Sequence, residues 1–296
     1  RGSVGREPVE QGPGETHFQL LAGDDFRPIL PQDALGPANT HGSAGSFHSA
    51  RGLVKCHTKF RTSPWGTSVT HAAITGWGKC LPPNVLTNAD LATFLDTNDE
   101  WITSRTGISE RRISHVSLEE MAYVSSMRAL AAAGLDPADV ELIVIGTCSF
   151  DDQVPNQASG LQVRLGAKRA AAYDVNTACT SFLYALSTAN ALIRTGVVKN
   201  AVVVGGELIS AFMDWHNRGV CVLFGDGCAA VVLEATDKVE GLLGEKLGCD
   251  SDARNTLVVK GMGGRYVNQG RPYGETSWIF EGPEIFKRAV LGMSGA

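Results

Sequence analysis

The segment Asp174–Leu183 constrains the fold of this chain more than any other part of the sequence. An apolar run over Ala170–Val175 predicts a buried strand, and a helical pattern of apolar residues follows over Ala178–Gly196, where the glycine predicts the end of the helix. The chain therefore turns from strand to helix at Cys179. Helix N-terminal N–H groups and the helix dipole favour negative charge, so this position predicts a lowered thiol pKa. A thiolate there is suited to accept an acyl group.

The rest of the chain from about Ile74 alternates helical and β-rich patterns. These elements are a helix opened by a capping box at Ser117 and Glu120 and ending near Gly134, a strand over Leu142–Thr147, a helix with Pro155 in its first turn and ending at Gly166, and β-rich runs over Ala201–Val204 and Ala229–Leu233. Helices that alternate with buried strands predict a layered α/β domain.

Composition limits the classes of protein to which the chain can belong. Its 296 residues are 43% hydrophobic, which suffices for a large core, and no run of eighteen apolar residues predicts a membrane span. The net charge of −5 argues against a nucleic-acid partner. The seven cysteines show no zinc-site spacing, so no metal is expected, and Cys148, Cys221 and Cys228 are expected to be small core residues. Scattered cysteines in apolar contexts suit a reducing cytoplasm.

Three regions are expected along the chain. Residues 1–68 are rich in Gly, Pro, Ser, Thr and His without sustained periodicity, and are interpreted as an atypical, disordered leader. Residues 69–237 contain the strand–helix turn with Cys179. Residues 238–296 are interpreted as a shorter, truncated region that follows it.

Four motifs in a fixed order resemble a known family. They are the stretch Leu81–Leu91, the stretch Asp96–Ile108 around Trp101, the turn at Cys179, and the stretch Asn217–Gly227. Together they are similar to the β-ketoacyl-(acyl carrier protein) synthase III group of the thiolase-like superfamily. The resemblance covers about residues 71–290. It implies a thiolase-like layered fold, with the N-terminal half present and only the start of the C-terminal half.

The resemblance implies an acyl-CoA-primed condensing enzyme of fatty-acid synthesis initiation. Such an enzyme moves an acyl group from coenzyme A to the cysteine, then condenses it with malonyl-acyl carrier protein. Cys179 would be the catalytic residue, no cofactor would be needed, and the protein would be a homodimer. The family's catalytic His and Asn have no counterpart here, since the last histidine is His216, interpreted as a solvated loop residue, and no Asn follows Gln269. Two alternatives therefore stay open, a cysteine-dependent acyl hydrolase or transacylase and an inactive dimerising fragment.

The resemblance also assigns binding residues. Trp101 and Arg218 would hold the adenine of coenzyme A between an indole and a guanidinium, and Arg105 would lie near the nucleotide phosphates. Val154 would close the acyl pocket of a dimer partner, and Lys287 and Arg288 would contact the acidic carrier protein. Ser181 departs from the glycine usual in the family, and its hydroxyl is expected to crowd the turn.

Overall fold

A mixed five-stranded sheet has the order β1-β7-β6-β4-β5. Its strands are β1 (His71–Cys80), β4 (Leu142–Gly146), β5 (Ala171–Val175), β6 (Asn200–Leu208) and β7 (Asp226–Thr236). β4 pairs in parallel with β5 and β6, whereas β7 pairs antiparallel with β6 and β1. Gly146 lies in register with both Val175 and Gly205, so the three parallel strands end at one edge of the sheet. Residues that follow these ends are brought together.

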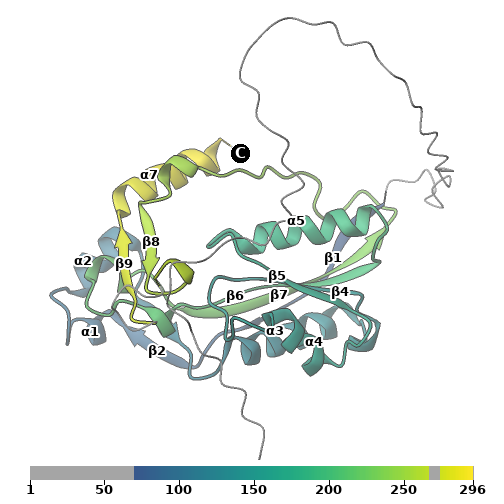
Figure 1. Ribbon diagram of the computed structural model, residues 1–296, viewed down its shortest axis with the longest axis horizontal. Helices are drawn as coiled ribbons and strands as arrows, with labels where there is room; N and C mark the ends of the chain where they lie inside the picture. Colours follow the sequence, from purple (N-terminus) through teal and green to yellow (C-terminus); the bar gives the residue numbers. More distant parts are fainter. Residues whose placement is uncertain (1–69, 267–273, 296) are drawn as a thin grey trace, which may run out of the picture. The chain divides into compact units, whose positions relative to one another are not determined.

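The computed structural model describes residues 70–266 and 274–295 of the chain (Figure 1). The expected leader, residues 1–68, lies outside these described residues. The division expected between residues 237 and 238 stays a prediction.

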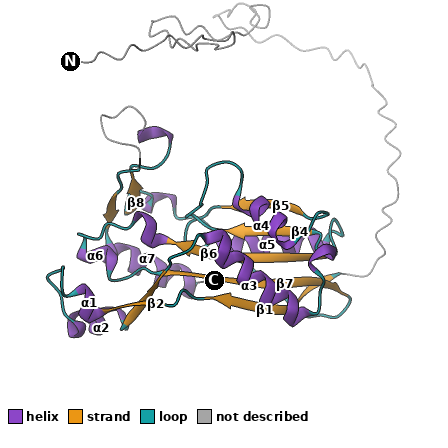
Figure 2. Ribbon diagram, turned by 90° about the horizontal axis from the view of Figure 1, so that it is seen from below, coloured by secondary structure: helices purple, strands orange, loops and turns teal. Residues whose placement is uncertain are grey.

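Helices cover both faces of the sheet. Figures 1 and 2 show α5 (Ser181–Arg194) on one face and α3 (Leu118–Ala133) with α4 (Gln157–Leu165) on the other. Each side has its own buried core, one joining α3 and α4 to side chains such as Ile143 and Val202, the other joining α5 to Val144 and Val203. Alternate residues of β4 and β6 therefore pack into the cores on opposite sides of the sheet, because successive side chains of a strand point to opposite faces. The predicted layered α/β fold is confirmed.

The chain has further elements outside the five-stranded sheet and its three covering helices. They are β2 (Asn84–Thr87), α1 (Asn88–Leu91), α2 (Asp99–Thr106), β3 (Glu110–Ile113), η2 (Pro137–Asp139), η3 (Ile209–Phe212), α6 (Arg218–Cys221), η4 (Ser251–Ala253), β8 (Leu257–Lys260), η5 (Gly264–Tyr266), β9 (Ser277–Phe280) and α7 (Gly282–Ser294). β2 pairs with β3, and β8 pairs with β9. The β8–β9 hairpin is attached to the rest through Trp278, whose Nε1 donates to the Phe212 carbonyl at 2.9 Å.

Three local expectations are wrong. β5 is an edge strand with partly exposed side chains, not a buried one, because only β4 pairs with it among the described strands. Pro155 precedes α4, whose N-cap is Asn156. Ser117 does cap α3 by accepting from the Glu120 N–H, but the Glu120 carboxylate pairs with Arg164 at 2.6 Å and does not complete a capping box.

Candidate functional site

Cys179 lies in the turn between β5 and α5. Ala178, directly before it, has a φ of +54°, a left-handed conformation that is uncommon for residues other than glycine. The Ser181 hydroxyl accepts from the Thr177 N–H at 2.9 Å and donates to the Ala178 carbonyl at 2.5 Å. Ser181 therefore stabilises the turn, and the expectation that its hydroxyl would crowd the turn is wrong.

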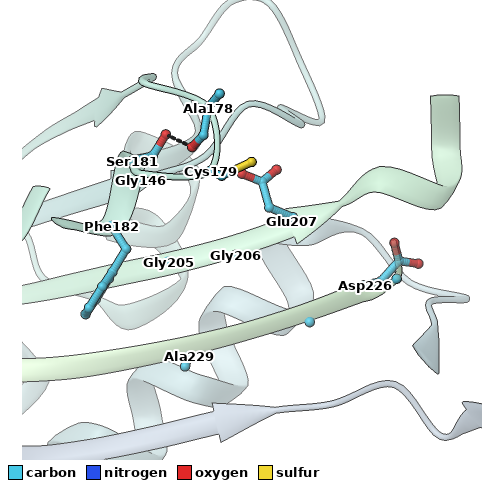
Figure 3. Close-up of a pocket in the computed structure, with 12 residues that line it drawn as sticks. Gly146, Ala178, Cys179, Ser181, Phe182, Gly205, Gly206, Glu207, Asp226 and Ala229 are labelled. Carbon is cyan, nitrogen blue, oxygen red and sulfur yellow. Dashed lines mark hydrogen bonds between the residues drawn. The ribbon is translucent and has the colours of Figure 1, made fainter. Parts of the chain in front are cut away.

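Cys179 opens onto a pocket of about 440 Å³ at the ends of the parallel strands (Figure 3). Its lining is mostly glycine and small or apolar residues: Gly146, Ala178, Cys179, Ser181, Phe182, Gly205, Gly206, Glu207, Gly225, Asp226, Gly227 and Ala229. Gly146 has no room for a side chain, since a Cβ there would lie 2.5 Å from the Ser181 carbonyl carbon. A Cβ on Gly205 would lie 2.9 Å from Phe182 Cβ. These glycines allow the first turn of α5, and Cys179 with it, to lie directly on the sheet.

Glu207, near the end of β6, presents a carboxylate beside Cys179 (Figure 3). The Ser149 hydroxyl donates to its Oε2 at 2.6 Å and the Thr147 hydroxyl at 3.2 Å. The Cys148 N–H donates to Oε1 at 3.1 Å, and the Cys148 thiol donates to Oε2 at 3.4 Å. The β4–α4 loop thus fixes the carboxylate from several directions.

The thiols around Glu207 are less acidic than free cysteine. Burial, and then the Glu207 charge, raise the pKa of Cys179. The same two causes raise the pKa of Cys148 to about 12. The lowered pKa expected for Cys179 from its place before a helix is therefore wrong. The side chain of Cys179 is exposed at the pocket mouth, yet partial burial of the thiol and the Glu207 carboxylate oppose its ionisation, whereas a backbone hydrogen bond at Cys179 favours it.

The buried cysteines divide into two kinds. Cys221 and Cys228 are buried in apolar clusters, as expected for core residues. Cys148 is only half-buried and its thiol is a hydrogen-bond donor to Glu207, so the expectation that it is simply a core residue is incomplete. Its high pKa leaves Cys179 as the more acidic of the two thiols in the region.

The three residues expected to bind nucleotide lie together at α2 and α6. The guanidinium carbon of Arg105 lies 4.5 Å from the centre of the Trp101 ring, and that of Arg218 lies 4.6 Å from it. Arg218 donates to the Asp96 carbonyl at 2.6 Å, with the Asp96 carboxylate 3.9 Å away. Trp101 is half-buried and both arginines are exposed, so the group faces solvent.

The remaining expected residues do not line the pocket of Cys179. Val154 is 85% exposed in the loop before α4. Lys287 is exposed on α7, whereas Arg288 is bound to Asp250 at 2.5 Å and to Glu284 at 2.6 Å. His216 is exposed in the loop before α6 and does not line the pocket of Cys179.

Glu207 is the site residue that the sequence analysis missed. Two signals were available: it follows a run of valines ending in Gly205 and Gly206, and it comes at the carboxyl end of a predicted strand. Carboxyl ends of parallel strands meet at one edge of a sheet, where ligands commonly bind.

The described residues contain neither a candidate metal site nor a candidate membrane-spanning helix. Over residues 70–266 and 274–295, no cluster of His, Cys, Asp and Glu has the makeup of a metal site. Within the same ranges, none of the helices has the length and apolar character needed to cross a membrane.

A family model and a curated relative connect this chain to one family. The family model described as 3-oxoacyl-(acyl-carrier-protein) synthase III matches residues 173–251. The chain is 49% identical to β-ketoacyl-(acyl-carrier-protein) synthase III 2 of Vibrio vulnificus over 226 residues, which make up 76% of this chain and 62% of that protein. It therefore spans about three fifths of the length of that relative.

A second relative and a solved structure extend the agreement. The β-ketoacyl-(acyl-carrier-protein) synthase III of Roseiflexus castenholzii is 41% identical over 235 residues, or 76% of this chain and 69% of that protein. The crystal structure of 3-oxoacyl-(acyl-carrier-protein) synthase III from Aquifex aeolicus matches with a TM-score of 0.66 and 37% identity, over 73% of this chain and 66% of that one. The expected thiolase-like fold is thereby confirmed, and the chain belongs to the β-ketoacyl-(acyl-carrier-protein) synthase III family.

Proposed function

We propose that this protein is an acyl-CoA-primed condensing enzyme in which Cys179 carries the acyl group. The acyl group moves from coenzyme A to the Cys179 sulfur, and the acyl-enzyme condenses with malonyl-acyl carrier protein. The products are 3-oxoacyl-acyl carrier protein, carbon dioxide and coenzyme A, and no cofactor is required. The observation that carries the proposal is the exposed Cys179 thiol at the mouth of a small, largely apolar pocket. A nucleophile at the mouth of such a pocket suits covalent acyl transfer.

The nucleotide of the acyl donor is placed at Trp101. An indole with two guanidinium groups against it offers both a stacking surface for adenine and positive charge for phosphates. Arg105 and Arg218 supply that charge. Opening of the contact between Arg218 and Trp101 would be needed for adenine to lie between them.

A homodimer is proposed from the free edge of β5. Among the described strands only β4 pairs with β5, so the other edge presents unpaired backbone groups. The Tyr173 hydroxyl is buried without a hydrogen-bond partner, and the nearby Val163 is 78% exposed. An unpaired, apolar strand edge of this kind is suited to pairing with a second copy. Val154 would then be covered by the partner and reach its acyl pocket.

The acidic carrier protein is proposed to bind near the basic side chains of α7. Lys287 is exposed and free to attract an acidic protein, whereas Arg288 is neutralised by Asp250 and Glu284. We therefore assign the electrostatic attraction to Lys287 rather than to Arg288.

Six free cysteines in the described ranges suit a reducing compartment, the cytoplasm.

The test is acyl transfer followed by condensation. Purified protein is incubated with acetyl-CoA, and then with malonyl-acyl carrier protein, and both the acetylated peptide and the 3-oxoacyl product are followed by mass spectrometry. The proposal expects acetyl on Cys179 and a 3-oxoacyl product that requires it. Acetylation of Cys179 without any product would instead favour a transacylase or hydrolase.

A further inference from the structure

Two acidic side chains line the pocket of Cys179, and they differ in what they can do there. Asp226 accepts from the Ser114 N–H at 2.7 Å, the Ser210 N–H at 2.9 Å and the Ser210 hydroxyl at 2.6 Å, so it serves to hold loops together. Figure 3 shows its carboxylate away from Cys179, whereas the carboxylate of Glu207 lies beside the sulfur. Glu207 is thus the acidic group that can act on the thiol.

The position of Glu207 is fixed from behind by the loop that follows β4. The Ser149 hydroxyl donates to Glu207 and itself accepts from the Leu208 N–H at 2.7 Å, which sets the direction of its hydrogen. Thr147 and Cys148 add further donors. Most of these bonds end on Oε2, whereas among the described residues Oε1 accepts only from the Cys148 N–H at 3.1 Å, so an acceptor site remains on Oε1. Such an arrangement is typical of a base whose orientation is set by a third group.

We propose that Glu207 is the general base for Cys179, accepting the thiol proton as the sulfur attacks the acyl donor. This inference rests on the proposed acyl-transfer function and assigns its proton acceptor. General bases act within hydrogen-bond reach of the proton that they abstract, and contacts in the free protein are often longer than in the complex.

The step balances without any further reactant. The Cys179 S–H bond breaks, its proton goes to a Glu207 oxygen, and the sulfur bonds to the thioester carbonyl carbon. When the tetrahedral adduct collapses, the bond from that carbon to the leaving sulfur breaks. The proton passes from Glu207 to the leaving thiolate, so Glu207 is restored and nothing is oxidised or reduced.

The thiol of Cys179 could lose its proton before the attack or during it. The charges around Cys179 favour loss of the proton during the attack. Among the described residues, the titratable groups that act on Cys179 are Glu207 from β6 and Cys148 from the β4–α4 loop, whereas the carboxylate of Asp226 from β7 lies away from it. Neither Glu207 nor Cys148 carries positive charge, and the first turn of α5 has no acidic side chain. Because burial and Glu207 both raise the pKa of Cys179, the resting group is a thiol, which needs a base when it reacts.

The experiment compares two reactions of Cys179 in wild-type protein, Glu207→Gln and Glu207→Asp. Alkylation by iodoacetamide consumes thiolate that is already present, so removal of the nearby charge should accelerate it at pH 7, about threefold or more. Acetylation by S-acetyl-N-acetylcysteamine, a small thioester that needs no nucleotide site, should instead become slower, about a hundredfold when a general base is lost.

Glu207→Asp should restore part of the acetylation rate. Glu234→Gln, which removes a carboxylate from β7 outside the pocket, should change neither reaction, and thermal melting checks that each variant is folded.

Faster alkylation together with slower acetylation in Glu207→Gln would support the role of Glu207 as the general base. Acceleration of both reactions would overturn it and leave Glu207 as a charge that only opposes ionisation. Unchanged alkylation, or a wild-type Cys179 that does not react with the small thioester, would also overturn it. If the small thioester acetylates Cys179 but acetyl-CoA does not, the proposed function fails while the role of Glu207 stands.

Discussion

Arg218 lies against the indole of Trp101, with its guanidinium carbon 4.6 Å from the ring centre. The two residues expected to enclose adenine therefore contact each other directly. Arg218 also donates to the Asp96 carbonyl at 2.6 Å, which fixes it in this position. Adenine must displace this contact to enter, and its stacking energy has to exceed that of the cation–π contact it replaces.

Trp101→Ala and Arg218→Ala are each expected to weaken coenzyme A binding by about 1–2 kcal/mol, because each removes one stacking surface. Arg218→Lys keeps the charge but not the plane, so it should bind less tightly than wild type. Isothermal titration calorimetry measures the affinities. Trp77→Ala is the control, since Trp77 is a 67% exposed tryptophan on β1. Unchanged affinity in all three site variants would place the nucleotide elsewhere.

Cys179→Ala is expected to abolish acetylation by acetyl-CoA while leaving the melting temperature close to that of wild type. The reason is that an exposed thiol at a pocket mouth contributes little packing. Cys249→Ala removes the other exposed cysteine of the described ranges and should leave acetylation intact. Acetyl found on Cys249, with Cys179 unmodified, would contradict the assignment.

Gly146→Ala is expected to lower the free energy of unfolding by about 1–3 kcal/mol, as overpacking of a close contact does. A Cβ there would approach the Ser181 carbonyl oxygen to 2.6 Å and push the start of α5 away from the sheet. Cys179 should then be displaced and acetylated more slowly. Gly244→Ala has open space around its Cβ and is the control in urea unfolding. Equal effects of the two substitutions would show that α5 does not depend on Gly146.

Ala178→Gly is expected to raise the free energy of unfolding by about 0.5–1 kcal/mol. The left-handed conformation of Ala178 costs about 1–2 kcal/mol, and the larger chain entropy of glycine offsets part of the gain. Ala191→Gly, in the interior of α5, should have the opposite sign and cost about 1 kcal/mol. Chemical denaturation of both variants is the measurement, and destabilisation by Ala178→Gly would show that the turn is not strained.

Two features that depend on neighbouring residues could be predicted from the sequence. The turn at Cys179 and the N-cap at Ser117 follow from local patterns, and the structure has both. The acidity of Cys179 could not be predicted in this way, because its pKa is raised by burial and then by the charge of Glu207, which comes from β6. Contact between the two depends on the strand order of the sheet. The strand order cannot be predicted from a local sequence pattern.

The position of β5 illustrates the same limit. Its apolar run is compatible with a central or an edge strand, and only the pairing of the other strands leaves it at the edge. Likewise, Glu120 fits a capping box by spacing, yet Arg164 from α4 competes for its carboxylate. The motifs predicted Cys179 as the nucleophile and Trp101, Arg105 and Arg218 as nucleotide-binding residues, and these roles stay predictions, whereas Glu207 was proposed as the base from the structure.

The glycines beneath the pocket have a consequence for how substrate preference can change. Gly146 and Gly205 leave backbone, not side chains, as the surface between α5 and the sheet, and neither can gain an atom without moving the helix. The deep part of the pocket therefore cannot be reshaped by single substitutions at these two positions. Under the proposed function, acyl-group preference can instead be varied at Phe182 and Ala229, two lining residues whose side chains can grow or shrink. Mutational libraries that seek new acyl donors should leave the glycines fixed and sample those walls.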